Sequence, residues 1–214
     1  MSLSSHPTAP PSPWQPLLPW FTATEESNSS CQIWAQASCS AAGLQLRYRL
    51  IWDPAEHTVL VPQQDADVRC GPQRRDGLWQ HTCFEAFGGV LGSDDYWEFN
   101  LAPSGDWNVY RFASYRERQV LEQSYGALPL KVMGPRTAPP AADCRLTPPC
   151  ALLELDLRCS LPPLLQERLQ TGSTLELGLT AVLEHPGGEL SYWALNHPGP
   201  EPDFHDRRGW SLRL

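Results

Sequence analysis

Residues 78–116 read LWQHTCFEAFGGVLGSDDYWEFNLAPSGDWNVYRFASYR and contain three strand-like runs separated by two short turns. Apolar and polar residues alternate within the runs, as they do in a β-strand that buries one face. The PSGDW link at 103–107 has the Pro, Ser, Gly and Asp of a tight turn, so YWEFNLA and WNVYRF are predicted to form an antiparallel hairpin. This part of the chain therefore predicts an antiparallel sheet.

The alternation within residues 78–116 divides their side chains into two sets. The first set is assigned to the core and consists of Phe84, Trp97, Phe99 and Leu101. The second set is assigned to the surface and consists of Trp79, His81, Glu85, Tyr96, Glu98 and Asn100. Aromatic rings beside carboxyl and amide groups are typical of small-molecule sites, so the surface set is the candidate ligand-binding face.

Alternating runs also occur on both sides of this stretch. Strands are predicted over residues 31–38, 44–52, 128–133, 151–158, 174–185, 191–195 and 209–214, with HTVLVP at 57–62 as a further candidate. Residues 161–172 form the one predicted helix, because Pro162 and Pro163 suit its first turn and Gly172 suits its end.

Many short strands and one short helix predict an all-β fold. The class expected is an antiparallel β-sandwich of two sheets, immunoglobulin-like or jelly-roll-like, with alternating apolar faces packed together. A closed barrel is the alternative. A length of 214 residues suits a single all-β domain. We expect a Pro- and Ser-rich N-terminal arm over residues 1–22 and one domain over 23–214.

Charge and hydrophobicity indicate which partners to expect. The formal net charge of −8 and the lack of a run of Lys and Arg argue against nucleic acid. The first residues have neither the basic start nor the apolar core of a signal peptide. No run approaches the roughly 20 apolar residues that span a bilayer. A cytoplasmic protein without a membrane partner is therefore expected.

Neither a metal nor a cofactor is expected from the cysteines and histidines. The seven cysteines include no CxxC pair, and the spacings of the internal histidines fit no zinc template. Most of the cysteines are expected to be reduced. Cys144 and Cys150 flank a Pro-containing loop that would let them pair in an oxidising setting.

Three segments taken in order, LWQHTCFEAF, YWEFNLAPSGDW and PDFHDRRGW, resemble the carbohydrate-binding module family 9 group, one of the DOMON-like β-sandwiches. The resemblance spans roughly residues 31–214. It implies a sandwich of two antiparallel sheets that binds a sugar or, in some DOMON branches, a haem. Trp79 and Glu85 match the spacing of the sugar-binding motif, and Asn100 falls in the corresponding second strand.

The chain also departs from the family pattern. His81 and Thr82 replace the paired acidic residues that follow the LW pair, and Glu98 stands where a basic or neutral side chain is expected in a sugar binder. No motif places the second of the two aromatics that clasp the pyranose ring, for which Trp193 is available. The resemblance therefore implies the fold more securely than the ligand.

The function expected is non-catalytic binding of a carbohydrate or a similar polyhydroxylated small molecule. Sugar recognition combines an aromatic face for the ring C–H groups with fixed polar groups for the hydroxyls. The candidate ligand-binding residues are Trp79, His81, Glu85, Tyr96, Glu98, Asn100, Arg111 and Trp193. For any one tryptophan, packing in the core is the ordinary alternative.

Other functions stay open at this point. A scaffold domain would dock a protein partner on exposed aromatics, and a haem-binding DOMON domain would need a cofactor. A glycosidase would use Glu85 and Glu98 as a pair of close carboxylates. Ion pairs from these glutamates to Arg47, Arg49 or Arg111 across the sheet are favoured over such a catalytic pair.

Overall fold

The computed structural model describes residues 12–20, 30–56, 58–62, 71–138, 149–169 and 172–214. The described strands are β1 (Gln15–Pro19), β2 (Cys31–Ser40), β3 (Gly43–Trp52), β4 (Cys83–Val90), β5 (Tyr96–Leu101), β6 (Trp107–Phe112), β7 (Val120–Leu121), β8 (Lys131–Thr137), β9 (Ala151–Cys159), β10 (Leu175–Glu184), β11 (Leu190–Ala194) and β12 (Leu212–Arg213). One α-helix, α1 (Pro163–Leu169), and two 3₁₀ turns, η1 (Leu78–Gln80) and η2 (Arg207–Gly209), complete the described elements.

Eleven of the twelve described strands follow one another in a single antiparallel path of hydrogen bonds. Their order is β7-β6-β5-β4-β10-β11-β1-β2-β3-β9-β8, and β12 pairs with β10. The link is β1, because its first three residues pair with β2 whereas Leu18 and Pro19 pair with β11. The predicted all-β class with one short helix is confirmed. The two separate sheets of the prediction are instead joined through β1.

The linking strand β1 lies inside residues 1–22, the stretch that was predicted to be a Pro- and Ser-rich arm. Leu17 is only 3% exposed and belongs to the main core. Burial of this leucine and pairing on both sides of the strand outweigh the weak strand propensity of the neighbouring prolines. The division of the chain into an arm and one domain stays a prediction.

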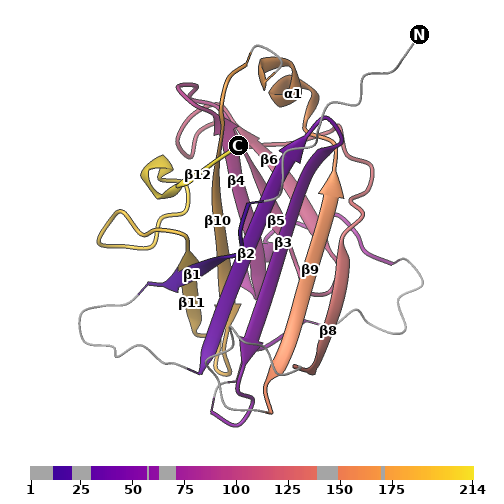
Figure 1. Ribbon diagram of the computed structural model, residues 1–214, viewed down its shortest axis with the longest axis vertical. Helices are drawn as coiled ribbons and strands as arrows, with labels where there is room; N and C mark the ends of the chain where they lie inside the picture. The colour runs from indigo at the N-terminus through magenta and orange to yellow at the C-terminus, as the bar shows by residue number, and fades with distance from the viewer. Residues whose placement is uncertain (1–11, 21–29, 57, 63–70, 139–148, 170–171) are drawn as a thin grey trace.

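The main core lies between the two halves of this curled sheet. In Figure 1, β2, β3 and β9 lie in front of β4, β5 and β6. The ring centroids of Tyr48 on β3 and Phe84 on β4 are 5.3 Å apart, and the Tyr48 hydroxyl donates to the main-chain oxygen of Glu85 at 2.5 Å. All four residues of the predicted core set are in this core: Phe84, Trp97, Phe99 and Leu101. Each such side chain stabilises the fold by about 1.5–3 kcal/mol.

The second set of side chains on β4 and β5 is buried too, which corrects its assignment to the surface. Every residue of both strands is buried. On this face Trp210 packs in a second apolar cluster with Phe87, Tyr96, Tyr110 and Phe112. Trp210 belongs to the chain that follows β11, which we call the C-terminal segment. Alternation separates the two faces of a strand correctly. It does not show that a segment more than a hundred residues later covers one of them.

Smaller differences concern the ends of the predicted elements. Leu78–Gln80 is the turn η1, so β4 begins only at Cys83. Residues 58–62 form no strand, although the Leu60 amide donates to the main-chain oxygen of Glu184 at 2.8 Å. Cys144 and its pairing with Cys150 lie outside the described residues. Among the described helices, none is long and apolar enough to cross a membrane.

Candidate functional site

A cavity of about 430 Å³ opens on the second face of β4 and β5. Its floor includes Glu85 and Phe87 from β4 and Glu98 from β5. Trp79 from η1, Tyr192 from β11, and Phe204 and His205 from the C-terminal segment also line it. Segments from distant parts of the chain therefore meet at one aromatic and acidic site.

The register between β4 and β5 puts both glutamates on the cavity side. Glu85 stands opposite Asn100, and Glu98 stands opposite Phe87. Because side chains alternate along a strand, Glu98 and Asn100 project from the same face, and Glu85 projects beside them. The carboxyl groups are therefore diagonal neighbours across the strand pair.

Few polar groups satisfy these two buried carboxyls. Glu85 is 2% exposed and Glu98 is 5% exposed. The Asn100 side-chain amide donates to Glu98 Oε1 at 2.7 Å, and the Thr180 hydroxyl lies 3.5 Å from Glu85 Oε2. Glu85 Oε1 accepts no hydrogen bond from any described residue. One buried carboxyl oxygen at the cavity floor is therefore available to a ligand.

Burial favours the protonated forms of both glutamates, and the charge of Glu98 adds to this effect at Glu85. Desolvation, and then the nearby charge of Glu98, raise the pKa of Glu85 well above its usual range. Desolvation raises the pKa of Glu98 from 4.5 to about 7, even though the hydrogen bond from Asn100 and the charge of Arg116 act to lower it. In its protonated form, each of these carboxyl groups can donate as well as accept hydrogen bonds.

The ion pairs predicted for these glutamates are wrong. Both Arg47 and Arg49 lie on the outer face of β3, away from β4 and β5, since the intervening Tyr48 points into the core. The arginines proposed as partners, Arg47, Arg49 and Arg111, instead bind the side chains of Gln36, Glu154 and Asp95, respectively. No arginine therefore pairs directly with the cavity floor among the described contacts.

His205 forms part of the cavity rim and is neutral near pH 7. Its Nε2 lies 3.9 Å from Glu98 Oε2, and its Nδ1 lies 2.8 Å from the Tyr96 hydroxyl. Burial, assisted by the charge of Arg116, lowers the pKa of His205 to about 4. The Tyr96 hydroxyl also accepts from the Arg116 amide at 3.1 Å. This chain of contacts fixes the imidazole ring beside Glu98 without adding positive charge.

A clamp between two loops closes one side of the cavity. The Arg116 guanidinium bonds to Asp203 Oδ1 at 2.9 Å, and the Tyr115 hydroxyl donates to Asp203 Oδ2 at 2.5 Å. Arg116 follows β6, whereas Asp203 lies just before Phe204 in the C-terminal segment. The ion pair therefore holds this segment against the loop after β6.

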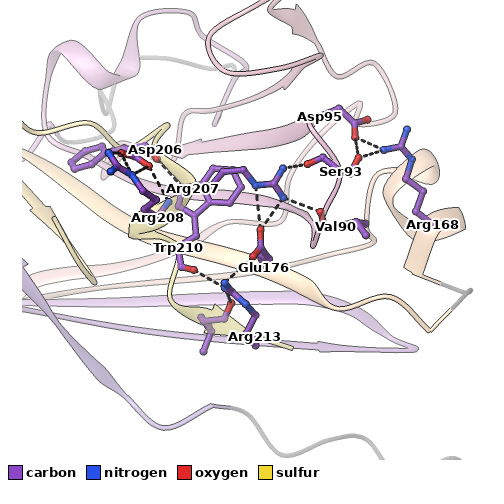
Figure 2. Close-up of polar contacts among 12 residues, drawn as sticks. Val90, Ser93, Asp95, Arg168, Glu176, Asp206, Arg207, Arg208, Trp210 and Arg213 are labelled. Atoms are coloured by element: carbon purple, nitrogen blue, oxygen red, sulfur yellow. Dashed lines mark hydrogen bonds and ion pairs between the residues drawn. The ribbon is translucent and has the colours of Figure 1, made fainter. Parts of the chain in front are cut away.

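A second set of polar contacts anchors the C-terminal segment at its other end, as Figure 2 shows. Arg207 bonds to Glu176 on β10 at 3.0 Å and to the main-chain oxygens of Val90 and Ser93 at the end of β4. Arg213 bonds to the other carboxyl oxygen of Glu176 at 2.8 Å. These bonds fix the backbone that carries Phe204 and His205 over the cavity.

The structure brings together only part of the predicted ligand-binding set. Trp79, Glu85 and Glu98 line the cavity. Tyr96 and Asn100 lie behind the lining, where they hold His205 and Glu98 in place. A ligand-binding role for any of these residues stays a prediction.

The other three candidates lie outside the cavity. His81 precedes β4 and binds Glu184 at 2.8 Å. Arg111 stands opposite Trp97, so it projects toward the other side of the sheet, where its guanidinium lies 5.5 Å from the centroid of that indole. Trp193 stands opposite Ala181 and belongs to the main core. The registers that place Arg111 and Trp193 on the other face of the sheet are not visible in the sequence.

Sequence reasoning missed further residues of the lining, among them Arg116, Tyr192, Phe204 and His205. The last two lie in the PDFH part of the resemblance, in the segment between β11 and η2. Within it, the Asp203 carboxylate accepts from the His205 amide at 3.1 Å. Within the described ranges, no three His, Cys, Asp or Glu side chains are grouped so that they could hold a metal ion.

The fold has a counterpart among solved structures. The chain is similar to the crystal structure of a putative carbohydrate-binding protein from Bacteroides uniformis, with a TM-score of 0.56 and 15% sequence identity. The match covers 92% of this chain and 83% of that chain. No protein-family model and no curated protein matches the sequence. At this level of identity the likeness shows a shared fold alone.

The raised pKa of Glu98 gives a prediction for stability. Between pH 4.5 and about 7 the folded protein binds more protons at this group than the unfolded chain does. The free energy of unfolding should therefore fall as the pH rises through this window, by about 3 kcal/mol from Glu98, and level off above it. Urea denaturation at a series of pH values measures this slope, which we expect to be reduced in Glu98→Gln.

Comparing the parent protein with Glu98→Gln also removes the opposing effect that His205 has on the pH dependence of stability. Its pKa is lowered from 6.5 to about 4, so its contribution makes the protein more stable as the pH rises through that window. Because His205 is present in both proteins, its effect largely cancels in their difference. Parallel pH profiles for parent and variant would show that Glu98 is not held protonated in the fold.

Proposed function

We propose that this protein is a non-catalytic binding protein for a carbohydrate or a similar polyhydroxylated small molecule, which occupies the cavity beside Trp79. The observation that carries the proposal is the meeting of aromatic side chains with two buried carboxyls, Glu85 and Glu98, in one cavity. A volume of about 430 Å³ falls within the range of about 300–1,000 Å³ that is typical of small-molecule sites.

The chemistry of the lining suits a sugar ring. Trp79 is held by an edge-on contact with Tyr110, with ring centroids 5.8 Å apart and an interplanar angle of 72°. A fixed indole offers an apolar face to ring C–H groups. The carboxyl groups of Glu85 and Glu98 supply donors and acceptors to hydroxyls, and the unpartnered Glu85 Oε1 gains a bond when a ligand hydroxyl reaches it.

The proposal extends to the type of fold and to location. We propose that the two packed halves correspond to the layers of a DOMON-like sandwich, with residues 23–214 as its single domain, and that the protein acts in the cytoplasm. The order of the three resembling segments and the similarity to the Bacteroides uniformis fold support the first part.

Replacement of Trp79 with Ala tests the site. We expect sugar binding to weaken by at least about tenfold, or about 1.4 kcal/mol, because the ring C–H groups lose their apolar face. Isothermal titration calorimetry with a panel of monosaccharides and disaccharides measures the affinity.

Trp14→Ala is the matched control for this variant. Trp14 lies over the outer face of β3, where the guanidinium carbons of Arg47 and Arg49 are 4.9 and 4.7 Å from its ring centroid. Its loss removes the same indole far from the cavity lining. An affinity that is unchanged by Trp79→Ala, or reduced equally by both variants, would remove the cavity from the proposed function.

Cleavage of a glycosidic bond is the second candidate function. It is favoured by one observation, that Glu85 and Glu98 share a cavity in which burial raises the pKa of both carboxyl groups. Release of p-nitrophenol from p-nitrophenyl glycosides, abolished in both Glu85→Gln and Glu98→Gln, would establish this activity in place of simple binding.

A further inference from the structure

The charges around the cavity are unbalanced when both floor glutamates are ionised. Of the described residues that line it, Glu85 and Glu98 are the acidic ones and Arg116 and His205 the basic ones. Arg116 already pairs with Asp203 at 2.9 Å, and His205 is held neutral. The two carboxylates are thus left without a cation of their own, and burial raises the pKa of both.

The walls of the cavity favour a cation as well. Phe87, Phe112 and Tyr192 line it together with Trp79 and Phe204. The faces of aromatic rings carry a negative electrostatic potential, which attracts ammonium groups most strongly where water is excluded. A hydroxyl group gains little from this potential, so the walls distinguish an amine from an alcohol of the same size.

We propose that the ligand of this cavity is an amino sugar, whose protonated amine lies between Glu85 Oε1 and Glu98 Oε2. This inference rests on the proposed function and narrows it, because the sugar ring still packs on Trp79. An ammonium group donates three hydrogen bonds and can satisfy the unpartnered Glu85 oxygen and the second Glu98 oxygen together.

The other titratable groups near the floor keep their charge while these two change. Burial raises the pKa of Cys83 well above its usual value and that of Tyr96 to about 12, so both are neutral below pH 9. The pKa of Tyr110 is also raised, chiefly by burial. Arg116 and Asp203 stay paired and ionised. Binding of the amine should therefore displace protons from the floor glutamates alone.

Four small probes separate the contribution of the ammonium group to binding from that of the sugar hydroxyls. Glucosamine carries both hydroxyls and an ammonium group, glucose carries hydroxyls only, and N-acetylglucosamine has the same nitrogen without its charge. Cyclohexylamine carries an ammonium group on an apolar ring. Calorimetry with the parent protein at about pH 6.5 should show glucosamine binding at least about tenfold more tightly than each of the other three. The apparent heat of glucosamine binding should also depend on the ionisation enthalpy of the buffer, because the buffer takes up the protons that binding releases.

Charge removal at the floor provides the second arm. The variant Glu85→Gln/Glu98→Gln should lose the preference for glucosamine over glucose and release no protons on binding. Glu56→Gln removes one carboxylate from an exposed turn and should retain both properties. Thermal unfolding of each variant checks that it is folded, and the four-probe comparison on the parent does not depend on any variant.

Each result bears differently on the two proposals. Glucose or N-acetylglucosamine binding as tightly as glucosamine would overturn the amino sugar and leave the polyol site standing. Binding of cyclohexylamine alone would overturn the sugar and show a plain cation site. No binding of any probe would overturn both the amino sugar and the proposed function for this class of ring.

Discussion

Replacing Arg207 with Met should lower the free energy of unfolding by about 3–5 kcal/mol. Its guanidinium bonds to Glu176 at 3.0 Å and to the main-chain oxygens of Val90 and Ser93 (Figure 2). Since Glu176 is 5% exposed, the variant would leave a buried carboxylate with Arg213 as its remaining partner. Two carbonyl groups would also lose a charged donor, at about 1–3 kcal/mol for each one that stays buried. Urea denaturation measures the loss.

Arg208→Met provides the matched control on the adjacent residue. The Arg208 side chain is 74% exposed and bonds to Asp206 at 2.5 Å. Removing the same charge from a solvated ion pair should change stability far less, because water replaces the lost contacts. Equal urea midpoints for the two variants would contradict the anchoring role given to Arg207.

Replacing Trp210 with Ala should have an effect of similar size, about 3–5 kcal/mol. The indole is 2% exposed, stacks with Phe87 at 6.1 Å between centroids and lies edge-on to Tyr96 at 5.3 Å. Its Nε1 donates to the main-chain oxygen of Phe204 at 2.9 Å. Loss of the ring should therefore weaken ligand binding as well as stability, because Phe204 is part of the cavity wall. Denaturation and calorimetry on one sample measure both.

A second substitution under the ring makes this prediction sharper. A Cβ atom on Gly178 would lie 2.4 Å from Cδ1 of Trp210, so the glycine in β10 is what lets the indole pack against the strand. Gly178→Ala alone should cost about 1–3 kcal/mol through this clash. In Trp210→Ala the clashing atom is gone, and the added methyl should cost much less. Additive losses in the double variant would show that ring and glycine do not pack as described.

The parts of the fold that follow from local sequence patterns could be predicted. The hairpin from Tyr96 to Phe112 follows from alternation and the PSGDW turn, and the structure contains it as β5 and β6. The helix α1 follows from Pro163 at its start. The predictions that failed concern features that depend on contacts between residues far apart in the chain. The strand β1 depends on Leu17 reaching a core formed by later strands, and prolines around it suggested an arm.

Prediction of the candidate site was limited in the same way, because local patterns do not reveal contacts between distant segments. Glu85 and Glu98 were found because they interrupt apolar strands, and their burial under a distant segment could not be read from alternation. The sequence left both roles open for Trp193, because a tryptophan suits a ligand site and a core equally well, and the register with Ala181 is what places it in the core. His205 gave little signal because a histidine between turn residues is usually a solvated loop residue.

The most direct test of the account is a heteronuclear NMR titration of the labelled protein with glucose, glucosamine and a panel of further sugars. We expect at least one sugar to shift the indole Nε1–H signal of Trp79 and the backbone amides of Glu85, Glu98 and His205, while the indole signal of Trp14 stays unchanged. Sugar-induced shifts that leave Trp79 and the cavity amides unmoved, or no shift with any sugar, would contradict a carbohydrate site in this cavity.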